Sequence, residues 1–230
     1  SYFRQNALLN KNGYNNFDDV LVKSNKALTI DEFKDHMISK NSLVIDVRNQ
    51  NEFIKKHIPN SLFVGLNGSF APWVGSIIKD INTKLLLVCD KGFEEEAILR
   101  LSRVGFDNCL GYLDGGINSW TSHNSFDVIE SISADDLSKT IESISLIDVR
   151  KTGERSNGYL LNSKHITLDS FQDDLTKIDI KNKHYIHCAG GYRSMIACSI
   201  LKRNGYSAVV DVKGGFSSIR NSNFKIINNE

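Results

Sequence analysis

A cysteine, two glycines and an arginine lie close together in the segment Cys188-Ala189-Gly190-Gly191-Tyr192-Arg193-Ser194. In a short loop before a helix, backbone N–H groups and the positive end of the helix dipole point toward a bound anion. They favour the thiolate of Cys188, and Arg193 adds a planar, permanently charged donor. We therefore predict that Cys188 is a nucleophile assisted by Arg193. The other loop residues are expected to bind an anion: Ala189, Gly190, Gly191, Tyr192 and Ser194.

This loop resembles the active loop of the rhodaneses, a family of sulfurtransferases whose loop begins with cysteine and usually carries arginine near its end. The resemblance implies that the Cys188 thiolate attacks the sulfane sulfur of thiosulfate or of a persulfide, and so becomes a persulfide itself. A second small molecule, such as cyanide, a thiol or sulfite, then takes the sulfur atom. This is nucleophilic catalysis in two covalent steps, and we expect it to need no cofactor.

Three alternatives stay open. Protein phosphatases share the arrangement of cysteine and arginine but place five residues between them, whereas only four, Ala189 to Tyr192, lie between them here. The smaller ring of N–H groups disfavours a phosphatase or an arsenate reductase. In the second alternative Cys188 is an inert, buried thiol. In the third, the chain is a non-catalytic scaffold or binding module.

The chain contains two copies of one pattern. Asp46-Val47-Arg48 recurs as Asp148-Val149-Arg150, and Leu113-Asp114-Gly115-Gly116 is answered by Val212-Lys213-Gly214-Gly215. Each copy begins with a helix signal, at Thr29 and at Ser133, and continues with short apolar runs that suggest parallel strands covered on both faces. We predict an α/β fold with two tandem rhodanese-like domains, each a small, mostly parallel sheet flanked by helices. The expected boundaries are 1–26 for a connector, 27–126 for the first domain and 127–230 for the second.

The first copy differs where the chemistry is expected. Its corresponding segment is Val88-Cys89-Asp90-Lys91-Gly92-Phe93-Glu94-Glu95-Glu96. Without a gap, Val88 is opposite Cys188, whereas a deletion of one residue aligns Cys89 with it. Acidic side chains in this segment oppose a thiolate and repel an anionic donor. We predict that the first copy is catalytically silent.

Asp148 and Arg150 stand at a predicted strand end and are expected to support the loop by bonding to the backbone and to Glu154. Rhodaneses usually carry a Gly-His-Ile-Pro-like segment after this glutamate. The first copy keeps Lys56-His57-Ile58-Pro59, but the second has Gly158-Tyr159-Leu160-Leu161. This departure leaves the nucleophile in place and makes the packing beneath the loop uncertain.

The remaining histidines and cysteines suggest packing. His187 precedes Cys188 in a strand and so points to the opposite face. His184, His187 and Cys188 lack the paired spacing of a structural zinc site, and we predict no metal. Cys198 and Cys109 are expected to lie in the core, and with four cysteines in 230 residues the chain is typical of a reducing cytoplasm.

Composition limits the partners. Lysine and arginine number 28 against 27 acidic residues, which provides no basic field for nucleic acid, and no long apolar run predicts a membrane span. Residues 2–14 have no counterpart before the second copy. They resemble the connector of bacterial proteins that join a metallo-β-lactamase-like domain to two rhodanese domains. The resemblance implies that such a domain, a persulfide dioxygenase or related metallohydrolase, precedes this chain.

Overall fold

The computed structural model describes residues 17–140 and 144–228. The chain divides into two compact units, residues 1–127 and 128–230. Most of the expected connector lies outside the described residues. Its last part forms helix α2 (Phe17–Ser24), which packs against helix α6 (Glu94–Ser102) of unit 1.

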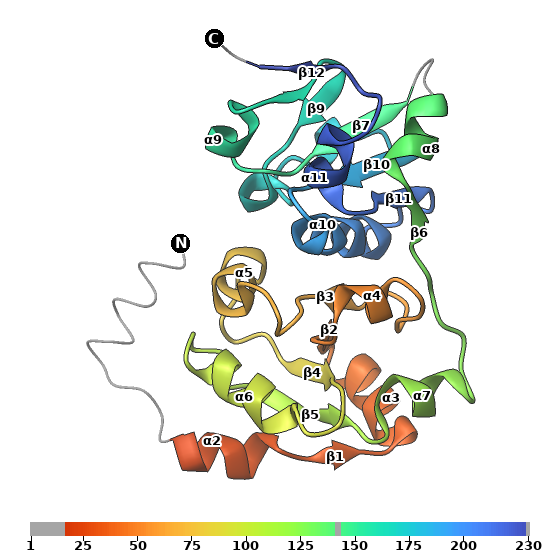
Figure 1. Ribbon diagram of the computed structural model, residues 1–230. Helices are drawn as coiled ribbons and strands as arrows, with labels where there is room; N and C mark the ends of the chain where they lie inside the picture. Colours follow the sequence, from red (N-terminus) through yellow and green to blue (C-terminus); the bar gives the residue numbers. More distant parts are fainter. Residues whose placement is uncertain (1–16, 141–143, 229–230) are drawn as a thin grey trace. The chain divides into compact units, whose positions relative to one another are not determined.

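Unit 1 contains a five-stranded sheet in the order β1-β5-β4-β2-β3, in which every described pair of neighbours is parallel. In Figure 1, α3 and α7 lie on one face of the sheet, and α5 and α6 lie on the other. The bounds of these elements are β1 Ala27–Leu28, α3 Ile30–Ser39, β2 Leu43–Asp46, α4 Gln50–Phe53, β3 Leu62–Phe63, α5 Phe70–Ile77, β4 Leu85–Val88, β5 Cys109–Leu113 and α7 Gly116–Thr121.

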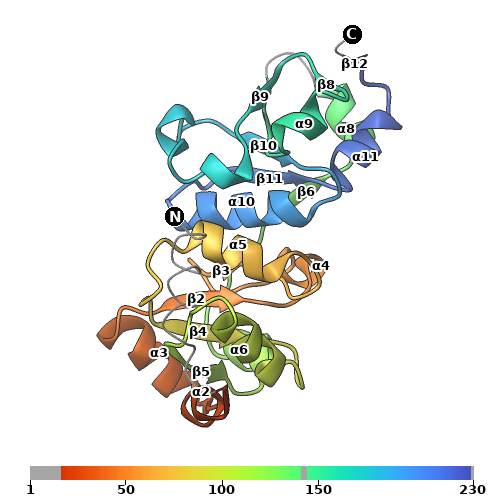
Figure 2. The same ribbon diagram turned by 90° about the vertical axis from the view of Figure 1, so that its left-hand side faces the viewer.

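Unit 2 repeats this plan with the strand order β6-β11-β10-β7-β9, again with parallel neighbours. Helix α10 lies on one face of the sheet, and α8 and α11 lie on the other (Figures 1 and 2). The bounds are β6 Glu130–Ile132, α8 Ala134–Lys139, β7 Ser145–Asp148, α9 Thr152–Arg155, β8 Tyr159–Leu160, β9 Ser163–His165, β10 His184–His187, α10 Tyr192–Arg203, β11 Val209–Val212, α11 Gly215–Arg220 and β12 Ile226–Ile227. Two short 3₁₀ turns, Leu168–Ser170 and Leu175–Lys177, follow β9.

Each sheet has an apolar core on one face, which is covered by α3 and α7 in unit 1 and by α8 and α11 in unit 2. In unit 1, Phe33 of α3 and Trp120 of α7 pack over Val44 and Leu86. In unit 2, Leu137 of α8 and Phe216 of α11 pack over Leu146. Both faces of β4 are buried, which explains its continuously apolar sequence.

The predicted helix starts are confirmed. The Thr29 side chain accepts a hydrogen bond from the backbone N–H of Glu32, whose own carboxylate accepts from the backbone N–H of Thr29, so the two form a capping box. Ser133 accepts from the backbone N–H of Asp136 in the same way. The predicted architecture of two α/β domains, each with a parallel sheet between helices, is also confirmed.

Candidate active site

The strand registers align the two copies of the loop. Asp46 pairs with Val88 in unit 1, and Asp148 pairs with His187 in unit 2. Val88 therefore corresponds to His187, and the residue that follows each strand is a cysteine. Of the two alignments that the sequence left open, the structure selects the one that places Cys89 opposite Cys188.

Cys188 lies at the carboxyl end of β10, and its side chain faces the start of α10. The backbone N–H of Gly191 donates to Cys188 Sγ at 3.1 Å. Gly191 has a φ of +109°, a conformation that glycine adopts without the penalty that other residues meet. The glycine therefore allows the loop to direct an N–H group at the sulfur atom.

The first residues of helix α11 donate hydrogen bonds to the backbone of this loop. The N–H of Phe216 donates to the carbonyl oxygen of Cys188 at 2.6 Å, and the N–H of Ser217 donates to that of Ala189 at 3.1 Å. A Cβ atom at Gly215 would lie 2.5 Å from the Cys188 carbonyl oxygen. Only a residue without a side chain allows this close approach, which explains the glycine at position 215.

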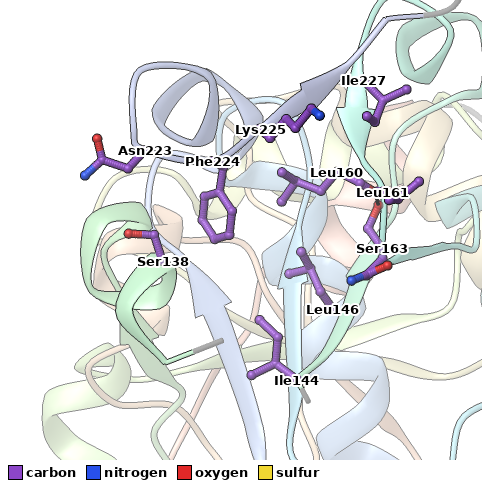
Figure 3. A pocket seen from close by; sticks show the side chains of 11 residues that line it. Ser138, Ile144, Leu146, Leu160, Leu161, Ser163, Asn223, Phe224, Lys225 and Ile227 are labelled. Atoms are coloured by element: carbon purple, nitrogen blue, oxygen red, sulfur yellow. Dashed lines mark hydrogen bonds between the residues drawn. The ribbon is translucent and has the colours of Figure 1, made fainter. Parts of the chain in front are cut away.

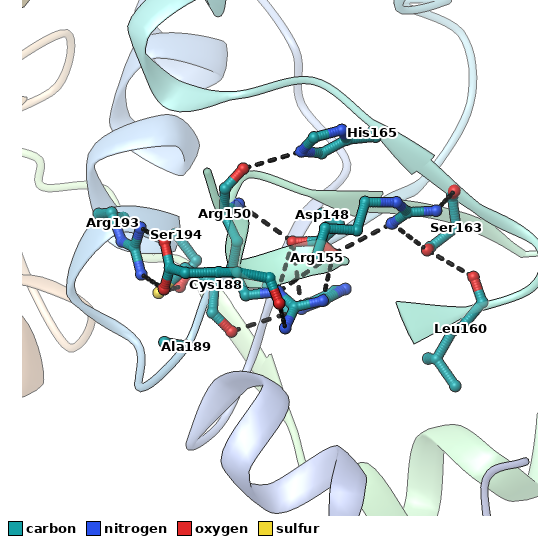
Figure 4. Close-up of polar contacts among 12 residues, drawn as sticks. Asp148, Arg150, Arg155, Leu160, Ser163, His165, Cys188, Ala189, Arg193 and Ser194 are labelled. Atoms are coloured by element: carbon teal, nitrogen blue, oxygen red, sulfur yellow. Dashed lines mark hydrogen bonds and ion pairs between the residues drawn. The ribbon is translucent and has the colours of Figure 1, made fainter. Parts of the chain in front are cut away.

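Arg193 stands beside Cys188 in Figure 4. Its guanidinium donates two hydrogen bonds to the carboxylate of Glu154 on α9, at 2.5 and 2.6 Å. These bonds raise the pKa of Arg193, and the nearby Cys188 sulfur raises it further. They also lower the pKa of Glu154. Sequence reasoning expected Glu154 to bond to Arg150 and missed its pairing with Arg193.

Asp148 and Arg150 form the frame below the loop. The Arg150 guanidinium donates to both oxygens of Asp148 and to the backbone carbonyls of Glu154 and Gly158. Arg155 donates to Asp148 as well, at 3.0 Å (Figure 4). Burial alone would raise the pKa of Asp148, but the hydrogen bonds from Arg150, the charge of His187 when it is protonated and the charge of Arg150 together lower it to about 2.

A buried polar chain runs from Cys188 into the domain. Cys188 Sγ lies 3.6 Å from the hydroxyl oxygen of Ser194, and that hydroxyl donates to Oδ1 of Asp211 on β11 at 2.6 Å. Ser194 was expected in the loop, but sequence reasoning did not single out Asp211. An acidic residue in the otherwise apolar run Val209-Val210-Asp211-Val212 was the available signal.

In unit 1 a carboxylate accepts the hydrogen bond that the Cys188 sulfur accepts in unit 2. Gly92, with a φ of +91°, corresponds to Gly191, and its N–H donates to Oε2 of Glu94 at 2.7 Å. Glu94 stands where unit 2 has Arg193. Burial raises the pKa of the Cys89 thiol, and the charge of Glu94 raises it further. Both causes oppose a thiolate at Cys89.

The departure at residues 158–161 has a clear structural result. Tyr159 and Leu160 form β8, which pairs antiparallel with β12 near the C-terminal end of the described chain. Leu160 and Phe224 line a pocket of about 490 Å³ beside these strands (Figure 3). None of its lining residues belongs to the Cys188 loop, so this pocket is separate from the site.

The other singled-out residues are packed. His187 is buried and stacks on Phe216, and burial lowers its pKa to about 4, which keeps the ring neutral. Cys109 and Cys198 lie in the cores as expected. Burial raises the pKa of Cys109 to about 12 and that of Cys198 well above its ordinary value.

Within residues 17–140 and 144–228, no three histidine, cysteine or acidic side chains come together in a way that could hold a metal ion. Among the helices of those same residues, none combines the length and apolarity needed to cross a membrane.

Comparison with known proteins gives two matches to one family model. The model of the rhodanese-like domain matches residues 29–123 and 133–222, one range in each unit. The exact boundaries predicted from the sequence, at residues 26 and 126, stay predictions.

Individual relatives match parts of the chain. The putative sulfurtransferase YtwF of Bacillus subtilis is 34% identical over 38% of this chain and 86% of its own length. The thiosulfate sulfurtransferase GlpE of Stutzerimonas stutzeri is 27% identical over 34% of this chain and 71% of its own length. For two further relatives the chain spans 45% and 56% of their length. Among solved structures, a rhodanese-like domain protein from Staphylococcus aureus is 30% identical, with a TM-score of 0.41, over 44% of this chain and 100% of that one.

Proposed function

This chain belongs to the rhodanese-like domain family and carries two copies of the domain, and on that basis we propose that it is a sulfurtransferase that works through a persulfide on Cys188. The observation that carries the proposal is the hydrogen bond from the Gly191 N–H to Cys188 Sγ at the start of α10. A sulfur atom in this position is stabilised as an anion by the N–H dipole, by the helix and by Arg193. The printed names of two relatives, a putative sulfurtransferase and a thiosulfate sulfurtransferase, support the same chemistry.

The proposed reaction has two displacements. The Cys188 thiolate attacks the outer sulfur of thiosulfate, the S–S bond of thiosulfate breaks, and sulfite leaves with the bonding electron pair. Cys188 then carries a persulfide, whose terminal sulfur is anionic and is stabilised by the same N–H groups. A thiophilic acceptor attacks that terminal sulfur and restores the thiolate. Each step is a substitution at sulfur in which the loop holds a constant negative charge.

The wild-type chain provides the direct test. After incubation with thiosulfate, the intact mass is expected to increase by one sulfur atom, and peptide mapping is expected to place that atom on Cys188. Addition of cyanide is expected to release it as thiocyanate. A chain that gains no sulfur and forms no thiocyanate contradicts the enzyme and favours the alternative, a binding module.

The proposal includes a silent first unit. The Glu94 carboxylate accepts the Gly92 N–H that a persulfide would need, and the raised pKa of Cys89 disfavours its thiolate. We therefore expect the Cys89 peptide to stay unmodified under the conditions that load Cys188. A persulfide on Cys89 in the same digest contradicts this expectation.

Arg193 is proposed to hold the anionic donor and to stay oriented through Glu154. Arg193→Ala removes a charged donor and leaves Glu154 to repel thiosulfate, so kcat/KM for thiosulfate is expected to fall about 10- to 100-fold. Arg193→Lys keeps the charge but loses the paired hydrogen bonds, and an intermediate value is expected. Steady-state thiocyanate formation measures both.

Arg220→Ala is the matched control, because Arg220 is an exposed arginine of unit 2 that donates to the Asn157 carbonyl. Its kcat/KM is expected to equal the wild-type value. If Arg193→Ala and Arg220→Ala have the same kcat/KM for thiosulfate, Arg193 does not hold the donor.

The proposed setting is a cytoplasmic fusion protein. The resemblance of residues 2–14 to fusion connectors supports a metallo-β-lactamase-like domain ahead of this chain. Reading the coding sequence upstream of residue 1 tests this. A start codon directly before Ser1 contradicts it.

A further inference from the structure

Asp211 is a buried carboxylate that the sulfur chemistry described above does not use. It is 5% exposed, and the hydrogen bond from Ser194 at 2.6 Å is short, as is usual when the acceptor is charged. Ser194 is itself fully buried and lies 3.6 Å from Cys188 Sγ. The Ser194 hydroxyl therefore links the carboxylate of Asp211 to the sulfur of Cys188.

The surroundings of the two groups differ in sign. The N–H of Gly191 and the guanidinium of Arg193 favour negative charge at Cys188. Within residues 17–140 and 144–228, the group that opposes the effect of burial on Asp211 is the Ser194 hydroxyl and not a cation, and burial raises the pKa of Asp211 to about 6. Of the groups that face it, α10 contributes Ser194 and Cys198, while its register neighbours in the sheet are Ile186 of β10 and Ser131 of β6.

We propose that Asp211 is a positioning residue of the site, which holds the proton of the Cys188 thiol while the hydroxyl of Ser194 relays it. This inference rests on the proposed role of Cys188 as the nucleophile. In the transfer, the S–H bond breaks and its electron pair stays on sulfur. The proton binds to Ser194 Oγ as the serine proton passes to Oδ1 of Asp211.

The relay keeps one negative charge where two would otherwise lie close together. With its proton on Asp211, the site has a thiolate beside a neutral acid, and Ser194 is free to donate its hydroxyl to the sulfur. An anionic donor such as thiosulfate then meets less repulsion.

Unit 1 lacks every part of this relay. The registers place Tyr112 opposite Leu87, as Asp211 stands opposite Ile186, so the carboxylate is replaced by tyrosine. In the loop, Glu95 stands where unit 2 has Ser194. The relay and the arginine therefore occur together in the same copy.

The test follows the alkylation of Cys188 by iodoacetamide as a function of pH, with the Cys188 peptide quantified by mass spectrometry. The wild type is expected to react in two steps, the first near the titration of Asp211 at about 6 and the second at higher pH. Asp211→Asn cannot take up the proton, and one step is expected, with the rate changing about tenfold per pH unit below its midpoint. Ser194→Ala is expected to react about tenfold more slowly than wild type at pH 7, because the thiolate loses a hydrogen bond.

Ser199→Ala is the control, since Ser199 is a buried serine of the same helix whose hydroxyl donates to the Ile196 carbonyl. Its profile is expected to match that of the wild type. If Asp211→Asn has the same pH profile of Cys188 alkylation as the wild type, the proposal is overturned. If Ser194→Ala is alkylated at the wild-type rate, Ser194 does not relay the proton. No sulfur donor is present in this assay, so its outcome is independent of whether Cys188 forms a persulfide.

Discussion

Replacement of Cys188 by serine is expected to lower thiocyanate formation by at least about a thousand-fold, and to abolish the gain of one sulfur atom after thiosulfate treatment. Serine keeps the shape of the side chain and the hydrogen bond from Gly191. Its hydroxyl, however, neither ionises near neutral pH nor forms a bond to sulfur that an acceptor can reopen. Steady-state kinetics and intact mass measure the two losses separately.

Cys89→Ser is the matched control, because Cys89 holds the equivalent position after β4 and is likewise buried. Activity and sulfur loading are expected to remain at wild-type levels. The opposite pattern, with activity lost in Cys89→Ser and kept in Cys188→Ser, would move the site to unit 1. Loss in both variants would mean that both cysteines carry sulfur.

The second large effect concerns stability. Asp148→Asn is expected to destabilise unit 2 by about 3–5 kcal/mol, because it leaves the guanidinium of Arg150 buried without its counter-charge. Arg150 is 3% exposed and donates to both oxygens of Asp148, and Arg155 would lose its bond to the same carboxylate. Urea unfolding followed by circular dichroism measures the change.

The pH dependence of this effect has a definite sign. The folded-state pKa of Asp148 is lowered to about 2, below its value of about 4 in an unfolded chain. Its stabilising contribution is therefore complete above about pH 4 and is lost as the pH falls toward 2. The difference between wild type and Asp148→Asn is expected to shrink over that range.

Asp169→Asn serves as the stability control, because Asp169 is an exposed aspartate of the same unit. Its unfolding midpoint is expected to match the wild type at every pH. A midpoint for Asp148→Asn equal to that of the control would show that the buried pair contributes nothing to folding.

Local sequence signals predicted much of the fold. Helix starts at Thr29 and Ser133 depend on contacts three residues away, so a short segment contains all the needed information. The strand β4 coincides with the apolar run Leu85–Val88, because a strand buried on both faces is apolar throughout. The apolar run Tyr185-Ile186 marks only the middle of β10, which has a histidine at each end.

Contacts between distant segments could not be predicted in this way. Glu154 and Arg193 are 39 positions apart, and Ser194 and Asp211 are 17 apart, so neither spacing indicates a contact. The pairing of β8 with β12 joins two strands of two residues each, which are too short for any periodicity.

The alignment of the two loops shows why a count along the sequence was insufficient. Cys89 lies 16 positions before Gly105, and Cys188 lies 17 positions before Gly205, so the second copy has one more residue between the loop and this glycine. Counting back from the later glycines Gly105 and Gly205 therefore shifts the loop by one position. Strand register does not depend on the length of the segment that follows the loop. The register pairs Asp46–Val88 and Asp148–His187 therefore identify Cys89 as the counterpart of Cys188.

The arginine frame has a consequence for how such a duplicated protein can change. Arg48 binds Asp46 in unit 1 just as Arg150 binds Asp148 in unit 2, although one loop carries glutamate where the other carries arginine. The Asp–Arg pair has the same hydrogen bonds in both units, although the loop residue has a negative charge in unit 1 (Glu94) and a positive charge in unit 2 (Arg193). The same Asp–Arg pair therefore supports two loops of opposite charge, so the loop sequence differs between the copies without loss of the contacts that support it.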